Sequence, residues 1–171
     1  MNIIVAVNSD WGIGLNGTQS IVISEDRRRF KALTDGGTVI TGRRTFDDFF
    51  GLLPNRKNII LTRDKQYKVD GAVVKHSIDD VLAEIDADSS EKVFILGGES
   101  VYKAFLPLCG FAYVTKIDAA PPSDTFFPNL DELREWAIIE QGQINEHRIY
   151  TKEQADIVHY SFILYKNSSI K

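Results

Sequence analysis

A single carboxylate on an otherwise apolar helix face is the first candidate for chemistry. Four residues spaced three, four and three apart share one face of the helix predicted over 24–33: Ile23, Asp26, Phe30 and Leu33. Burying an unpaired ion is costly, so Asp26 is paired, protonated or matched to a cationic group of a ligand. The alternative is a first-turn acid that complements the helix dipole or pairs with Arg29 or Lys31.

Arginines follow two of the predicted strands. Arg43 and Arg44 come just after the strand predicted over 38–41, and Arg63 lies just past the strand over 58–62. Open α/β sheets bind ligands at such strand ends, and guanidinium groups suit phosphate or carboxylate oxygens. Any one of these arginines alone is as easily a solvated surface group. Two strand ends that carry arginine in an acidic chain indicate an anion site.

Two glycine-rich segments also follow strands. Gly12-Ile13-Gly14-Leu15-Asn16-Gly17 fits the dinucleotide pattern GxGxxG, but β-rich residues follow it, and no acidic residue ends the second strand. The pattern therefore favours a loop that bends over a ligand beside the first strand, with a ligand-free mobile loop as the alternative. Gly97-Gly98 leads directly into a helix, where free backbone N–H groups can cradle phosphate. A tight turn that needs glycine for steric reasons alone is the other interpretation.

The elements that must position these groups alternate between strand and helix. Six short β-branched runs are predicted strands: Ile3–Val7, Thr38–Thr41, Asn58–Thr62, Ala72–Lys75, Val93–Leu96 and Tyr113–Ile117. The predicted helices are Ser24–Leu33, which begins with a cap-type serine, Ser77–Ile85 and Glu99–Leu106. Such alternation implies crossover connections and a largely parallel sheet. Two later runs, Ala137–Ile144 and Ile157–Tyr165, predict an antiparallel pair at the sheet edge, within one α/β domain over residues 1–171.

Composition excludes several classes of protein. Twenty basic against twenty-four acidic residues give a net charge of -4, a poor general match to nucleic acid. The one cysteine, Cys109, permits no intrachain disulfide and fits a reducing cytosol. No apolar run approaches the roughly 20 residues that span a bilayer, and the N-terminus has no signal-peptide pattern. The chain is therefore expected to be cytoplasmic, with no membrane or nucleic-acid partner, and nothing in it demands more than a monomer.

Taken in order, these segments resemble the dihydrofolate reductases over nearly the whole chain. The matching segments are Ile4-Val5-Ala6-Val7, Asp26 with Phe30-Lys31, Thr41–Phe46, Leu53–Leu61, Leu96–Tyr102, Tyr113–Asp118 and Asp124–Pro128. The resemblance implies a single-domain fold with a mixed, mostly parallel eight-stranded sheet flanked by helices. It also implies reduction of 7,8-dihydrofolate to 5,6,7,8-tetrahydrofolate by NADPH, in support of one-carbon and thymidylate metabolism. Two alternatives keep the fold: the pyrimidine reductase of riboflavin biosynthesis, and a nucleotide-binding protein without catalysis.

Roles for individual residues follow from the same resemblance. Asp26 would be the catalytic acid that hydrogen-bonds the pterin, and neither a nucleophile nor a metal is required. The residues implied in substrate binding are Ile4, Val5, Asp26, Arg27, Phe30, Lys31, Phe49, Leu53, Arg56, Leu96 and Thr115. Those implied in NADPH binding are Ala6, Ile13, Gly14, Gly17, Thr18, Gly42, Arg43, Arg44, Thr45, Leu61, Thr62, Arg63, Gly97, Gly98, Glu99, Ser100, Val101, Tyr102 and Thr125. Arg56 would bind the glutamate α-carboxylate of the substrate, and a cis peptide would join Gly97 to Gly98.

Three departures from the family pattern bear on this site. Ser20-Ile21 replaces the usual Pro-Trp, whose indole helps to order a water near the acid. Arg27 replaces an aliphatic residue that contacts the aminobenzoyl group. It is expected either to reach the glutamate tail or to point to solvent with the two arginines that follow it, and to weaken small antifolates that need an apolar wall. Ser100 replaces an arginine that binds the 2′-phosphate in many members, so Arg43 and Arg63 would supply the preference for NADPH.

Overall fold

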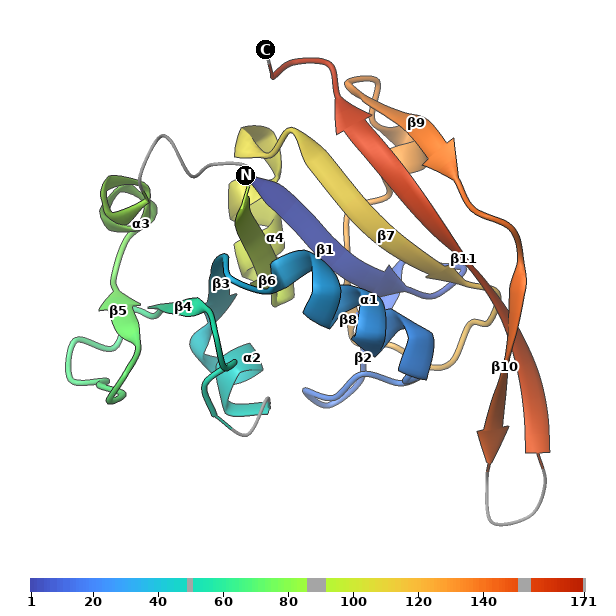
Figure 1. The fold of residues 1–171 in the computed structure, drawn as a ribbon, viewed down its shortest axis with the longest axis horizontal. Helices are drawn as coiled ribbons and strands as arrows, with labels where there is room; N and C mark the ends of the chain where they lie inside the picture. The colour runs from blue at the N-terminus through green and yellow to red at the C-terminus, as the bar shows by residue number, and fades with distance from the viewer. Residues whose placement is uncertain (49–50, 86–91, 151–154, 171) are drawn as a thin grey trace.

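The computed structural model describes residues 1–48, 51–85, 92–150 and 155–170. Its main sheet has the strand order β10-β11-β7-β1-β6-β3-β4-β5, with β9 also paired to β11 (Figure 1). The strands are β1 Asn2–Val7, β3 Thr38–Gly42, β4 Lys57–Leu61, β5 Val73–Lys75, β6 Val93–Gly97, β7 Phe111–Ile117, β9 Trp136–Gln141, β10 Asn145–Tyr150 and β11 Ala155–Asn167. Pairing is parallel from β7 to β5 and antiparallel around β11. The predicted mixed, mostly parallel sheet is confirmed, but within the described residues it has nine strands rather than eight, because β9 and β10 are separate strands that both pair with β11.

The C-terminal strands correct one expectation in detail. The strand predicted over 137–144 ends at Gln141, and a separate strand, β10, begins at Asn145. Both strands lie on the same edge of the long β11, β10 against its first half and β9 against its second. Between them the backbone N–H of Gly142 donates to the carbonyl of Phe162 at 2.8 Å. The sequence of β10 is mostly polar, so no apolar pattern predicts this edge strand. It forms because its backbone pairs with β11.

Helices cover both faces of the sheet. They are α1 Ser24–Thr34, α2 Arg43–Asp48, α3 Ile78–Glu84 and α4 Glu99–Phe105, with short 3-10 turns at Leu106–Leu108 and Leu130–Glu132. The N-cap of α3 is Ser77, whose hydroxyl accepts the N–H of Asp80 at 3.1 Å. The expected cap at Ser24 is wrong: Ile23 is the N-cap of α1, and the Ser24 hydroxyl donates to Glu25 instead. None of the helices in the described ranges is long and apolar enough to cross a membrane.

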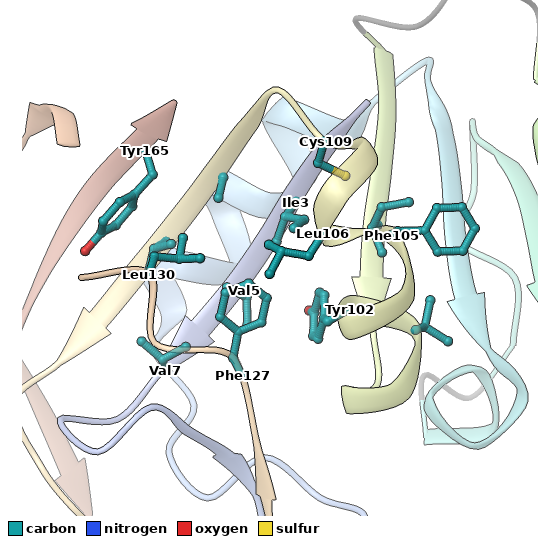
Figure 2. Close-up of a cluster of buried hydrophobic side chains, with 14 of the residues drawn as sticks. Ile3, Val5, Val7, Tyr102, Phe105, Leu106, Cys109, Phe127, Leu130 and Tyr165 are labelled. Atoms are coloured by element: carbon teal, nitrogen blue, oxygen red, sulfur yellow. The ribbon is translucent and has the colours of Figure 1, made fainter. Parts of the chain in front are cut away.

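Alternation along the buried strands decides which helix each side chain meets. In β1, Ile3, Val5 and Val7 lie in the large core that α4 covers (Figure 2), whereas Ile4 points to the opposite face. That opposite face carries α1, which lies in front of the sheet in Figure 1 with α4 behind it. Phe30 and Leu33 of α1 pack there against the cluster that contains Ile4. This packing holds the Asp26 helix face against the sheet.

Candidate active site

A long cleft of about 2020 Å³ runs along the carboxyl ends of the parallel strands and beside α1. Pockets that bind one small molecule typically measure about 300–1,000 Å³, so this cleft has room for two ligands end to end. Of the residues assigned above to substrate or cofactor, all but three line it. Thr115 lies behind Asp26, Gly97 lies behind its neighbour Gly98, and Phe49 is outside the described residues. The tertiary structure therefore brings together segments that lie far apart in the sequence.

Asp26 is half-buried in the first turn of α1 and faces β7. Its Oδ1 accepts a hydrogen bond from the hydroxyl of Thr115 at 2.5 Å, and Thr115 is only 1% exposed. Burial raises the pKa of Asp26, while the Thr115 bond and the charges of Arg29 and Arg27 act in the opposite direction. Among the described residues Asp26 takes part in no ion pair, so the alternative of a paired surface acid is not supported. Asp26 is a carboxyl group that can exchange a proton closer to neutral pH than an exposed aspartate.

Arg56 is held at one end of the cleft by three hydrogen bonds. Its Nε donates to the Thr34 hydroxyl at 2.8 Å, Nη1 to the Pro54 carbonyl at 2.6 Å and Nη2 to the Lys31 carbonyl at 3.0 Å. A guanidinium has five N–H donors, so Nη1 and Nη2 each keep one more. Two N–H groups of one guanidinium can bind the two oxygens of a carboxylate. Thr34, at the end of α1 and fully buried, is a positioning residue that sequence analysis did not identify.

Gly97 and Gly98 form the junction between β6 and α4 at the middle of the cleft. The peptide bond between them is cis, as the family resemblance implies. Gly97 has a φ of +103°, and a Cβ there would lie 2.6 Å from the Tyr102 ring. The hydroxyl of Tyr102 lies 2.9 and 2.8 Å from the carbonyls of Ile4 and Leu96, which fixes the ring between β1 and β6. This turn lets backbone rather than side chains meet a ligand.

Basic residues gather at the other end, past β3 and β4. Arg43 pairs with Asp64 at 3.2 Å and lies over the ring of Tyr67, so part of its charge is already neutralised. Arg44 and Arg63 also line the cleft, and neither has an ion-pair partner in the described ranges. These two arginines are therefore the stronger candidates for binding an anion.

The loop after β1 bends over the cleft. Its short strand β2 (Gly12–Gly14) pairs with β8 (Thr125–Phe126), and the hydroxyl of Thr125 donates to the Gly14 carbonyl at 3.0 Å. The backbone N–H of Asn16 donates to the Asp124 carboxylate at 2.9 Å. No helix follows before α1, which agrees with setting the GxGxxG match aside and expecting a covering loop.

The residues that depart from the family pattern differ in their burial and in whether they line the cleft. Ile21, at the site of the usual tryptophan, is 8% exposed and packs in a core cluster with Ile117, while Val22 lines the cleft instead. Arg27 is exposed at the cleft. The expectation that Arg29 points to solvent is wrong: its guanidinium carbon lies 4.4 Å from the centre of the Phe162 ring.

Several cleft residues escaped sequence analysis. They follow β5, sit in the covering loop, or flank residues that were assigned: His76, Ser77, Ile78, Asn16, Gln19, Val22, Asp48, Pro54, Asp64, Lys103, Ala104 and Asp124. His76 has its Nδ1 2.9 Å from the Thr62 carbonyl, beside Arg63. Its position in the sequence could have identified His76. Like Arg63, it comes just after a parallel strand and therefore lies at the same edge of the sheet.

Comparison with known proteins places the chain in one family. The family model for dihydrofolate reductase matches residues 1–166. The chain belongs to the dihydrofolate reductase family. A dihydrofolate reductase of Staphylococcus haemolyticus is 37% identical over 152 residues, which cover 88% of this chain and 90% of that protein. One from Bacillus subtilis is 33% identical over 173 residues, covering 99% and 96%.

The fold comparison agrees. The solved structure of Enterococcus faecalis dihydrofolate reductase complexed with NADP(H) and RAB-propyl superimposes with a TM-score of 0.79 and 28% identity, over 97% of this chain and 95% of that one. The match to the dihydrofolate reductase family extends over every segment that lines the cleft, because the last of them is Thr125. The alternative of a riboflavin-pathway reductase is not favoured.

Proposed function

We propose that the chain reduces 7,8-dihydrofolate to 5,6,7,8-tetrahydrofolate with NADPH as the hydride donor. The observation that carries the proposal is the half-buried Asp26, bonded to Thr115, inside a cleft with room for two ligands. A carboxylate in such a place can accept two N–H bonds from a flat heterocycle and fix its orientation. Its negative field also favours a proton on the nearby ring nitrogen. No group in this mechanism acts as a nucleophile.

The substrate side of the cleft has apolar walls and one cation, Arg56, that hydrogen bonds already hold in position. Ile4, Phe30 and Leu53 would line the ring and the aminobenzoyl group. The two N–H groups that Arg56 keeps would bind the glutamate α-carboxylate, with the three bonds to Thr34, Pro54 and Lys31 holding the fork in place. Because these bonds are present without substrate, the Arg56 side chain loses little conformational freedom when substrate binds.

The other side of the cleft fits a dinucleotide with an extra phosphate. Gly98 lets backbone approach, since a Cβ there would already lie 3.1 Å from the Thr45 hydroxyl. Arg44 and Arg63 would hold phosphates, and Ala6 and Gly14 would border the nicotinamide. When bound, NADPH would supply a hydride to a ring carbon of the substrate, and the adjacent ring nitrogen would take up a proton. The residues of the chain align the two rings and, through the covering loop, limit the access of water.

The test is an absorbance assay of purified protein with NADPH and dihydrofolate, with Asp26→Asn run in parallel. We expect oxidation of NADPH that requires both substrates and falls by roughly 10²–10⁴ in the variant near neutral pH, because the local source of protonation is lost. An Asp26→Asn variant with unchanged activity would contradict the role of Asp26. No turnover by the parent, with NADPH still bound, would support the pyrimidine reductase or a binding protein without catalysis.

The remaining expectations of the sequence stay predictions. They are a monomer, a cytoplasmic location and the absence of a nucleic-acid partner. The reaction would supply tetrahydrofolate to one-carbon and thymidylate metabolism.

A further inference from the structure

Arg29 is the one residue of the α1 arginine run that turns inward. Its guanidinium carbon lies 4.4 Å from the ring centre of Phe162 and 5.6 Å from that of Tyr113. Its Nη1 is buried and has no hydrogen-bond partner among the described residues. By contrast Arg28 pairs with Glu25 and its side chain is 73% exposed. A partly buried cation beside two aromatic faces interacts favourably with their π electrons. The negative charge of Asp26 also stabilises it.

The same patch of sheet carries both this cation and the acid's hydrogen-bond partner. Thr115 stands opposite Phe162 in the pairing of β7 with β11, so the two side chains share a face. Tyr113 lies two residues before Thr115 and points to that face as well. Arg29 follows Asp26 by three residues on α1, which places the two side chains on one side of the helix. The cation and the carboxylate thus meet the sheet next to each other without forming an ion pair.

We propose that Arg29 is a positioning residue that acts on the reaction as a half-buried counter-charge to Asp26, held beside it by the rings of Phe162 and Tyr113. The proposal rests on the proposed function for its kinetic consequence but not for its electrostatic one. A charge in this low-dielectric setting is screened less than the exposed arginines on the same helix. Arginine keeps its proton from pH 6 to pH 9, so its field is constant over that range.

The other groups around the pair are few. Asp26 interacts with Arg29 and Arg27 of its own helix, Thr115 of β7, Tyr102 of α4 and Tyr160 of β11. Arg29 interacts with Asp26, Tyr113 of β7 and Glu140 of β9. Of these, Arg29 and Arg27 are the only cations, and Arg27 is exposed. Removing the Arg29 charge therefore makes the potential at the acid more negative. Protons then bind more readily both to Asp26 and to a pterin nitrogen beside it.

Three variants separate charge from shape. Arg29→Met removes the charge and keeps the length of the chain, Arg29→Lys keeps a charge, and Arg28→Met removes the same unit charge from the exposed face. Where circular dichroism shows that Arg29→Met is not folded, Arg29→Gln takes its place. The first readout is the ¹³C titration of the Asp26 carboxyl carbon in ligand-free protein, with Asp26→Asn to assign the signal. The second is the single-turnover rate of hydride transfer from pH 6 to pH 9.

We expect the Asp26 titration midpoint to move to higher pH in Arg29→Met, to return most of the way in Arg29→Lys, and to stay in place in Arg28→Met. Because the reaction takes up a proton, hydride transfer at pH 9 should be roughly three- to tenfold faster in Arg29→Met than in the parent. An unmoved ¹³C midpoint in Arg29→Met, or an equal shift in Arg28→Met, would overturn the proposal. If the Asp26 midpoint moves in Arg29→Met but the parent shows no turnover, the result would support the counter-charge and count against the proposed function.

Discussion

The two ends of the cleft handle charge in opposite ways. At the Asp26 end, an ionisable group is half-buried and hydrogen-bonded, and a second charge, Arg29, is half-buried beside it. At the end past β3 and β4, Arg44 and Arg63 stand at strand termini, where solvent still screens them. Buried charges change the protonation of their neighbours, whereas exposed charges mainly attract ligands. The first end is therefore suited to the chemical step and its pH dependence, and the second to binding and selectivity.

The largest effect is expected at the turn that joins the two ends. Gly97→Ala should destabilise the fold by about 3–5 kcal/mol and abolish turnover, because it forces a side chain into φ +103° and against the tethered Tyr102 ring. Urea unfolding and NADPH binding measure this. Gly36→Ala is the control, since Gly36 also has a positive φ but has open space around it. Equal losses in the two variants would contradict the steric argument.

The next largest effect is expected at Arg56, at the substrate end of the cleft. Arg56→Lys should raise KM for dihydrofolate by roughly 10- to 100-fold with a much smaller change in kcat, because a lysine cannot bind a carboxylate with two parallel N–H groups. A dihydropterin without the glutamate tail serves as the control substrate, and its kinetics should barely change. If both substrates are affected alike, Arg56 does not bind the tail.

A smaller effect is expected at the exposed end. Arg63→Met should lower the preference for NADPH over NADH by about tenfold, and more salt should shrink that difference, since the charge is accessible to solvent. Lys68→Met makes the same charge change outside the cleft and should leave the preference intact. A parent that uses NADH and NADPH with equal efficiency would remove the basis for this assignment.

Arg27 adds a polar group to the rim of the substrate end. Arg27→Leu should strengthen inhibition by small antifolates that need an apolar wall, by roughly three- to fivefold, because a leucine restores about 1 kcal/mol of apolar contact. Inhibition constants of parent and variant measure this. Inhibition no stronger in the variant than in the parent would exclude the idea.

The smallest effect concerns stability and sharpens the contrast between the buried acid and ordinary surface acids. Because burial raises the pKa of Asp26, the folded protein holds the proton more tightly than the unfolded chain does. Stability is then lost as pH rises from the ordinary aspartate value through the raised one. The free energy of unfolding of Asp26→Asn should thus exceed that of the parent by about 1 kcal/mol at pH 8, and this difference should vanish near pH 3. The exposed Asp70→Asn should show no such gain at either pH.

The elements that sequence patterns predicted well are those with strong local signals. The buried strands are short β-branched runs, and α1 carries a regular apolar face, so their positions need no knowledge of distant contacts. Candidate residues at strand ends could also be identified, because the carboxyl ends of parallel strands meet at one edge. The family resemblance then added roles that spacing alone leaves open.

What escaped prediction depends on contacts between distant segments. The strand β10 exists because β11 pairs with it, and Thr34 positions Arg56 because a loop returns to the end of α1. Arg29 was expected in solvent, since three successive arginines carry no sign of which one turns inward. Only the rings of Phe162 and Tyr113, supplied by β11 and β7, show that it does.

Hydrophobic period and turn chemistry act over a few residues, so the amino-acid sequence alone is enough to locate the buried strands, the helices α1, α3 and α4, the acid on an apolar helix face and the arginines at strand ends. Which of these groups is buried, what it bonds to and how its proton affinity changes follow from the packing of distant segments. Desolvation and charge interactions depend on distances in space, and Asp26 and Thr115 are 89 residues apart in the chain.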